Sequence, residues 1–182
     1  MPLIDAKMKL VVVTDIFGKP SLRDCLSANL TELEEVQRFS LGDLCHRAYL
    51  SGEELHHHLF TEGGITVAAS ALRNLICDGS FGLGYSAGGT ALWQAVISGM
   101  PLAGLTCVSS TRLRNERAAP VQTHTFFGAL DKGQPSTDWL TTVPNTYKVF
   151  SGLEHSFYLD HVDDKALKAR SAICAAIMSM AG

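Results

Sequence analysis

Ser86 lies in the stretch GLGYSAGGTALWQAV (82–96), with glycines two residues before and two residues after it. A short hydrophobic run precedes the serine and an amphipathic run follows, which predicts a sharp turn between a strand and a helix. Gly84 and Gly88 would relieve the crowding where strand and helix pass closely, and the turn would aim the N–H of Ala87 at a developing oxyanion. The pattern favours an activated nucleophile. The alternative is a glycine-rich turn that binds phosphate, but the glycine spacing of the phosphate-binding motifs is absent.

A serine hydroxyl is a poor nucleophile near neutral pH, so a general base must come from elsewhere in the chain. Among seven histidines, His155 follows the last expected strand, in FSGLEHSFYLD, and is the preferred base. His46, which follows the second expected strand, is its main competitor. The remaining histidines are expected to be structural, packed or solvated rather than bound to a metal: His124, His56–His58 and His161.

The acid that orients the histidine is expected to be Asp131, in FFGALDKGQP after the fifth expected strand. The carboxyl ends of parallel strands meet at one edge of a sheet, so Asp131 would share that edge with Ser86 and His155. Asp138, in an expected helix, and Asp160, close to the histidine in sequence, are the alternatives. A purely structural role, capping its own loop, is the other interpretation of Asp131.

The elements that must position these residues alternate between continuously apolar strands and amphipathic helices. This alternation is typical of an α/β fold whose parallel sheet is covered on both faces. Strands are expected near Met8–Thr14, Val36–Leu41, Phe81–Tyr85, Leu102–Val108, Gln122–Phe127 and Thr146–Phe150. Helices are expected from Ser21, from Ser51 (with Glu54 as a capping box), after Gly63-Gly64, over Gly88–Ser98 and over Val162–Met180. No repeat, low-complexity tract or linker interrupts residues 1–182, which predicts a single domain.

Composition and charge narrow the classes of function. The chain has 182 residues, of which 46% are hydrophobic and 18% charged, and its formal net charge is -3. Nothing in this balance indicates nucleic acid or an anionic membrane as a partner. The five cysteines show no metal-ligand spacing and are expected to be reduced and buried. With neither a signal-peptide layout nor a membrane-length apolar run, we expect a cytoplasmic protein that needs no metal and no organic cofactor.

The chain order Ser86, Asp131, His155, with each residue following a strand, resembles the α/β-hydrolase superfamily. Three stretches are most similar to the dienelactone hydrolase group: VVVTDIFGKP to the loop after its first parallel strand, GYSAGG to its nucleophile turn, and SGLEHSFY to its histidine loop. The resemblance covers nearly the whole chain. It implies a compact α/β-hydrolase fold with a mostly parallel sheet of about six strands and no large lid.

The same resemblance implies that the N–H of Ile16 joins that of Ala87 in an oxyanion hole, with Asp15 beside the nucleophile. The chain also departs from the dienelactone hydrolase group in two ways. Serine stands where that group has a cysteine nucleophile. The arginine that the group carries just past its histidine is missing, since Tyr158 and Leu159 occupy that place.

These observations predict a serine hydrolase that cleaves a small ester, thioester or lactone through an acyl-enzyme. An acyltransferase with the same triad is one alternative, and a noncatalytic ligand-binding module with the same fold is another. The segment 43–64 is the expected partial cover of the site. The substrate pocket, which would bind a small acyl compound, is expected to include Asp15, Phe17, His46, Tyr49, Tyr85 and Arg112.

Overall fold

The computed structural model of this protein describes residues 8–182 and shows a six-stranded, all-parallel sheet. The strand order is β2-β1-β3-β4-β5-β6. The strands are β1 (Met8–Val13), β2 (Leu33–Phe39), β3 (Phe81–Tyr85), β4 (Gly104–Val108), β5 (Gln122–Gly128) and β6 (Thr146–Phe150). The chain therefore winds outward in one direction from β1 and in the other from β3. In open α/β sheets, ligands bind at such a switch point, beyond the carboxyl ends of the strands.

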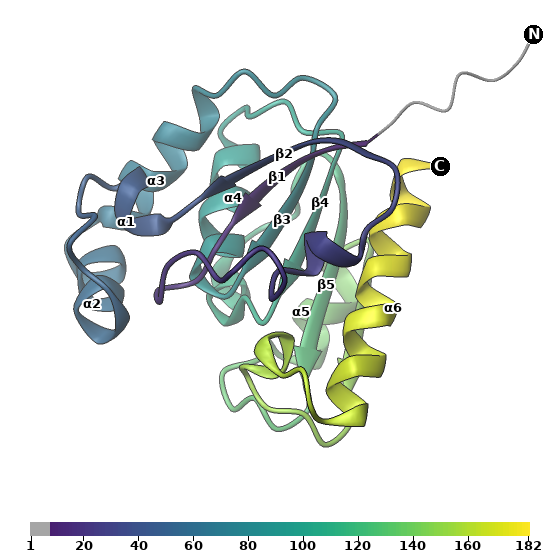
Figure 1. Cartoon of the computed structure of the whole chain (residues 1–182). Coiled ribbons are helices and arrows are strands. Elements are labelled where there is room, and N and C mark those ends of the chain that lie inside the picture. The colour runs from purple at the N-terminus through teal and green to yellow at the C-terminus, as the bar shows by residue number, and fades with distance from the viewer. Residues whose placement is uncertain (1–7) are drawn as a thin grey trace, which may run out of the picture.

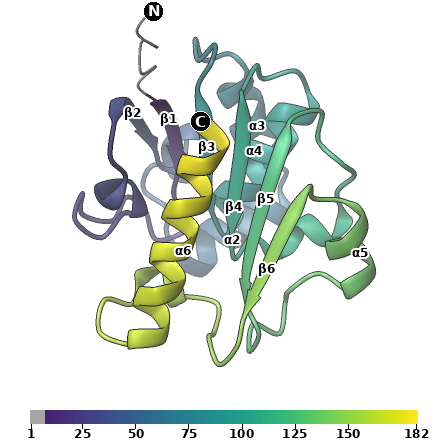
Figure 2. The ribbon, with the colours of Figure 1, turned by 90° about the vertical axis from the view of Figure 1, so that its right-hand side faces the viewer.

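Helices cover both faces of the sheet, as the sequence predicts. They are α1 (Leu41–Leu44), α2 (Gly52–Thr61), α3 (Gly64–Arg73), α4 (Ala87–Ile97), α5 (Thr137–Thr142) and α6 (Asp164–Ala181). Figure 1 shows α3 and α4 on one side of the sheet and α6 on the other, and Figure 2 shows α6 running across its face. No helix within residues 8–182 has the length and apolar character needed to cross a membrane.

The two faces of the sheet carry separate hydrophobic cores because alternate residues of each strand point in opposite directions. Val11 and Val13 of β1 belong to the core under α3 and α4, which includes the fully buried Trp93. Leu10 and Val12 belong to the core under α6. The continuously apolar strands thus reflect burial on both faces.

The helix expected from Ser21 does not form, and only a short 3₁₀ turn, Leu26–Asn29, is present there. The hydroxyl of Ser21 donates to the carboxylate of Asp24 at 2.7 Å instead of capping a helix. The segment is fixed by a distant side chain, since the N–H of Leu26 donates to the hydroxyl of Tyr85 at 3.0 Å. The first turns after β1 therefore depend on tertiary contacts rather than on helix propensity.

Two other boundaries differ from expectation because of capping. The strand β2 ends at Phe39, since the hydroxyl of Ser40 caps α1 by accepting from the N–H of Asp43. The final helix begins at Asp164, after Asp163 caps it, and not at Val162. Ser51 does precede α2, but its side chain makes no capping hydrogen bond.

Candidate active site

Ser86 occupies a sharp turn between β3 and α4, with backbone angles of φ 49° and ψ -121°. This left-handed conformation is unusual for a residue with a side chain and is typical of a strained functional turn. A Cβ at Gly84 would collide with the backbone of Gly89, and one at Gly88 would collide with the carbonyl of Thr14, which follows β1. The two glycines of the motif are therefore required by close backbone approach.

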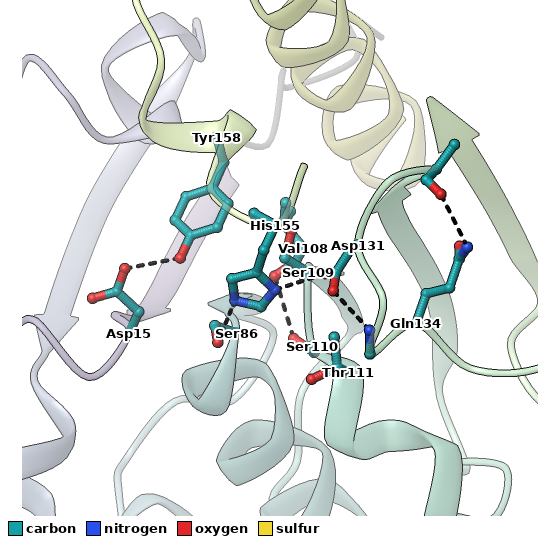
Figure 3. Close-up of polar contacts among 12 residues, drawn as sticks. Asp15, Ser86, Val108, Ser109, Ser110, Thr111, Asp131, Gln134, His155 and Tyr158 are labelled. Carbon is teal, nitrogen blue, oxygen red and sulfur yellow. Dashed lines mark hydrogen bonds and ion pairs between the residues drawn. The ribbon is translucent and has the colours of Figure 1, made fainter. Parts of the chain in front are cut away.

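A continuous chain of hydrogen bonds joins Ser86, His155 and Asp131 (Figure 3). The Nε2 atom of His155 lies 3.0 Å from the Oγ of Ser86, and its Nδ1 lies 2.6 Å from the Oδ2 of Asp131. The other oxygen of the buried Asp131, Oδ1, accepts from the N–H of Gly133 at 3.0 Å. A carboxylate at Nδ1 favours the tautomer whose Nε2 is free to accept the proton of the serine.

The histidine loop is held by the neighbouring strand ends. The hydroxyl of Ser109, directly after β4, donates to the carbonyl of His155 at 2.7 Å. The N–H of Leu130, next to Asp131, donates to the carbonyl of Leu153 at 2.9 Å. Ser109 also has a positive φ of 52° and is fully buried. Ser109 is not among the residues predicted from the sequence, because its partner lies 46 positions away.

The backbone N–H groups of Ile16 and Ala87 have no acceptor among residues 8–182. Ala87 is the first residue of α4, so its N–H is one of the free donors at a helix N-terminus. Two hydrogen bonds hold the loop that contains Ile16. The carbonyl of Ile16 accepts from the N–H of Gly52 at 2.9 Å, and the N–H of Phe17 donates to the carboxylate of Asp15 at 2.8 Å. Both N–H groups remain available to a ligand.

Asp15 lies in the same loop with its carboxylate buried, and both of its oxygens accept hydrogen bonds. Oδ1 accepts from the N–H of Phe17, and Oδ2 accepts from the hydroxyl of Tyr158 at 2.8 Å. Burial and the negative charge of Asp15 raise the pKa of Tyr158 far above its ordinary value, so its hydroxyl stays protonated. This contact is not predicted from the sequence, since Asp15 and Tyr158 lie 143 positions apart.

The alternatives for the acid and the base lie apart from this hydrogen-bonded chain. Asp138 is exposed in the first turn of α5, and Asp160 accepts from the N–H groups of Val162 and Asp163 in its own exposed turn. Those two bonds lower the pKa of Asp160. His46 is exposed and faces a groove along the outer side of α3.

The other histidines have the expected packed or solvated surroundings. His124 is buried in β5, where burial lowers its pKa, and His58 pairs with Glu62 at 2.8 Å on the surface of α2. His161 is exposed and lies 3.3 Å from Asp24. Within residues 8–182 no three His, Cys, Asp or Glu side chains are arranged as metal ligands.

The helix α2 contacts two segments that follow strands of the sheet. The N–H of its first residue, Gly52, donates to the carbonyl of Ile16 in the loop after β1, and near its end the guanidinium of Arg112, after β4, stacks on Phe60 at 4.7 Å. From Gly52 to Phe60 the helix rises about 12 Å, and β1 and β4 lie two strand spacings, about 10 Å, apart. α2 therefore connects the loop after β1 with the segment after β4. That the segment 43–64 partly covers the site stays a prediction.

The remaining expected pocket residues differ in their positions. Phe17 is 73% exposed beside α2, and Tyr49 is exposed at a hollow on the outer side of that helix. Tyr85 does not lie where a pocket residue would. Its ring is buried in the core under α6, and its hydroxyl accepts from the N–H of Leu26. Strand alternation turns Tyr85 to this face, together with Leu83.

Comparisons with known proteins address the fold. No protein-family model matches the sequence, and a search of curated proteins finds no significant match. Among solved structures, the alpha/beta hydrolase domain-containing protein 10 from mouse is similar at 11% identity, with a TM-score of 0.52 over 94% of this chain and 90% of that one. This chain has the α/β-hydrolase fold.

Two further solved structures with this fold match over most of their length. A dienelactone hydrolase-like promiscuous phosphotriesterase, P91 from metagenomic libraries, is 13% identical, with a TM-score of 0.60 over 95% of this chain and 86% of that one. A protein described as a predicted CIB-like hydrolase from Thermoplasma acidophilum is 14% identical, with a TM-score of 0.65 over 94% and 87%. The expected compact fold, close in arrangement to a dienelactone hydrolase-like protein, is confirmed.

Proposed function

We propose that this protein is a serine hydrolase that cleaves a small ester, thioester or lactone through an acyl-enzyme. The observation that carries the proposal is the hydrogen-bonded chain from Asp131 through His155 to Ser86. It lies at the switch point between β1 and β3, beside two free backbone N–H groups. Each part of the arrangement corresponds to one requirement of acyl transfer to serine.

In the first half of the reaction, the Oγ of Ser86 attacks the substrate carbonyl carbon while Nε2 of His155 takes its proton. The carbonyl oxygen becomes an oxyanion, which accepts hydrogen bonds from the N–H groups of Ile16 and Ala87. Asp131 stabilises the imidazolium that forms. Nε2 then gives the proton to the leaving alkoxide or thiolate as the carbon–oxygen or carbon–sulfur bond breaks, and the acyl group stays on Ser86.

In the second half, water attacks the acyl-enzyme with His155 again as the base, and the carboxylic acid leaves as Ser86 regains its proton. The side chain of His155 is 41% exposed, so water can reach the atom that must activate it. This access supports hydrolysis over transfer to another acceptor. The mechanism uses only groups of the chain itself.

Two further features support parts of this proposal. The fold neighbour P91 is by name a dienelactone hydrolase-like promiscuous phosphotriesterase, which is consistent with ester cleavage at such a site. All five cysteines are free and buried, which supports a reducing compartment and hence a cytoplasmic location. We propose a small-molecule acyl compound as the substrate.

The proposal is tested by covalent labelling of the purified protein with a fluorophosphonate, together with a panel of acyl esters of graded chain length. We expect one label per chain, located on Ser86, and turnover of at least one ester. Ser86→Ala should lose both. A folded Ser86→Ala variant that keeps its ester turnover would overturn the proposal. A wild-type protein that binds acyl compounds but neither labels nor turns over would instead indicate the noncatalytic binding module.

A further inference from the structure

Tyr158 contacts Asp15, Tyr85 and His155 at once. Its hydroxyl donates to the carboxylate of Asp15 in the oxyanion loop at 2.8 Å. Its ring stacks on Tyr85, the residue before Ser86, with centroids 5.1 Å apart and an interplanar angle of 17°. The same ring meets that of His155 edge to face at 6.5 Å. Figure 3 shows the phenol between Asp15 and the histidine.

The carboxylate of Asp15 requires this contact. Asp15 is 6% exposed and makes no ion pair with Lys, Arg or His within residues 8–182. Its charge is therefore compensated by two hydrogen bonds, from the N–H of Phe17 and from Tyr158. Burying a carboxylate without such donors is costly, so the loop conformation depends on both.

The backbone of Tyr158 is itself held in place from α6. The guanidinium of Arg170, which is almost fully buried, donates through Nη1 to the carbonyl of Tyr158. Through Nη2 it donates at 3.1 Å to the carbonyl of Asp24, in the segment that follows the oxyanion loop. One buried cation thus joins the backbone of Tyr158 to the segment that follows the loop of Asp15.

We propose that Tyr158 is a positioning residue: through Asp15 it holds the N–H of Ile16 in place relative to Ser86 and His155. The negative charge of Asp15 lies in the loop that would stabilise an oxyanion, and the phenol compensates part of that charge by donating a hydrogen bond to it. The inference rests on the proposed function, because it assigns a second role in the same reaction.

The first test is Tyr158→Phe, which removes the hydroxyl and keeps the ring that stacks on Tyr85. With a water-soluble 4-nitrophenyl ester, we expect kcat to fall about 10- to 100-fold, as for weakening one oxyanion donor. KM should change less than about threefold, because the interaction matters most in the transition state. Fluorophosphonate titration gives the concentration of active sites in each preparation. Tyr147→Phe, on the exposed edge strand β6, is the matched control, and its kcat should be unchanged.

The second test asks whether the hydroxyl acts through Asp15. In an Asp15→Ala background, adding Tyr158→Phe should lower kcat by less than about twofold, because coupled residues are non-additive. Asp15→Asn should retain most of the activity that Asp15→Ala loses, since the amide can accept from Phe17 and donate to the phenol oxygen. Comparing kcat of Asp15→Asn with kcat of Asp15→Ala still tests the inference if Tyr158→Phe folds poorly.

A third variant separates positioning from general loss of stability. Tyr85→Phe removes a hydroxyl of similar burial that contacts Leu26 and Cys25 and not Asp15. It should lower Tm about as much as Tyr158→Phe while lowering kcat far less. Equal losses of kcat in the two variants would overturn the inference.

The remaining outcomes are also decisive. Unchanged kcat in a folded Tyr158→Phe protein with Ser86 still labelled would overturn the inference alone. The same holds if the Tyr158→Phe effect were as large in the Asp15→Ala background as in the wild type. Retained turnover in Ser86→Ala would overturn the proposed function and this inference together.

Discussion

Replacing Asp131 by asparagine tests the orientation of the histidine. In the structure one oxygen of Asp131 accepts from the N–H of Gly133 and the other accepts from Nδ1 of His155. Asparagine has one acceptor and one donor at these two positions. If its oxygen keeps the bond to Gly133, its NH₂ faces Nδ1, and the histidine must carry its proton on Nε2. That tautomer cannot take the proton of Ser86.

The size of the effect follows from the alternative amide orientation. Flipping the amide restores the productive tautomer but sets NH₂ against the N–H of Gly133, which costs about 1–3 kcal/mol. This penalty alone reduces the productive population about 5- to 150-fold. The lost charge beside the imidazolium adds to it, so we expect kcat/KM to fall about 10²- to 10⁴-fold.

The assay is the initial rate on a 4-nitrophenyl ester, with Tm measured to confirm folding and Asp138→Asn as the control. Asp138 is an exposed aspartate on α5 in the next segment of the chain, and its replacement should leave kcat/KM within about twofold, as for surface changes away from a site. The reasoning would be refuted if a folded Asp131→Asn protein kept kcat/KM within about threefold of wild type, or if Asp138→Asn were the more damaging change.

Two more predictions concern the base and the oxyanion hole. His155→Ala should lower kcat about 10³-fold or more, whereas His46→Ala should be near wild type; in a Ser86→Ala background, removing His155 should cost little more, because triad effects are non-additive. If His46→Ala lost more activity than His155→Ala in the same ester assay, His46 rather than His155 would be the base. Ile16→Val should change kcat less than about threefold, since Ile16 acts through its N–H; a loss of 100-fold with unchanged Tm would show that its side chain takes part.

Local sequence motifs predict most features of the nucleophile turn. Gly84 and Gly88 were predicted to relieve crowding, and the structure shows backbone atoms where their Cβ atoms would be. The parallel sheet was predicted from continuously apolar strands, and its order places the expected triad residues at one edge. These features depend on residues close together in sequence or on the periodicity of apolar residues alone.

Long-range contacts explain what the sequence did not reveal. Tyr158 meets Asp15 across 143 positions, and Ser109 meets the carbonyl of His155 across 46, so neither pairing leaves a local pattern. The absent helix near Ser21 has the same cause, since tertiary contacts override helix propensity there. The position of Tyr85, by contrast, was accessible from strand alternation, which places it on the face of the sheet that packs against α6.

The central claim, that acyl transfer passes through Ser86, is tested most directly by trapping the acyl-enzyme. A slowly hydrolysed 4-nitrophenyl ester is mixed with the wild-type protein, the reaction is quenched with acid, and the peptide that contains Ser86 is analysed by mass spectrometry. We predict a burst of about one nitrophenolate per active site and the mass of one acyl group on Ser86, both absent in Ser86→Ala. Steady turnover with no burst, no acylated Ser86 peptide and equal rates in Ser86→Ala would contradict the account.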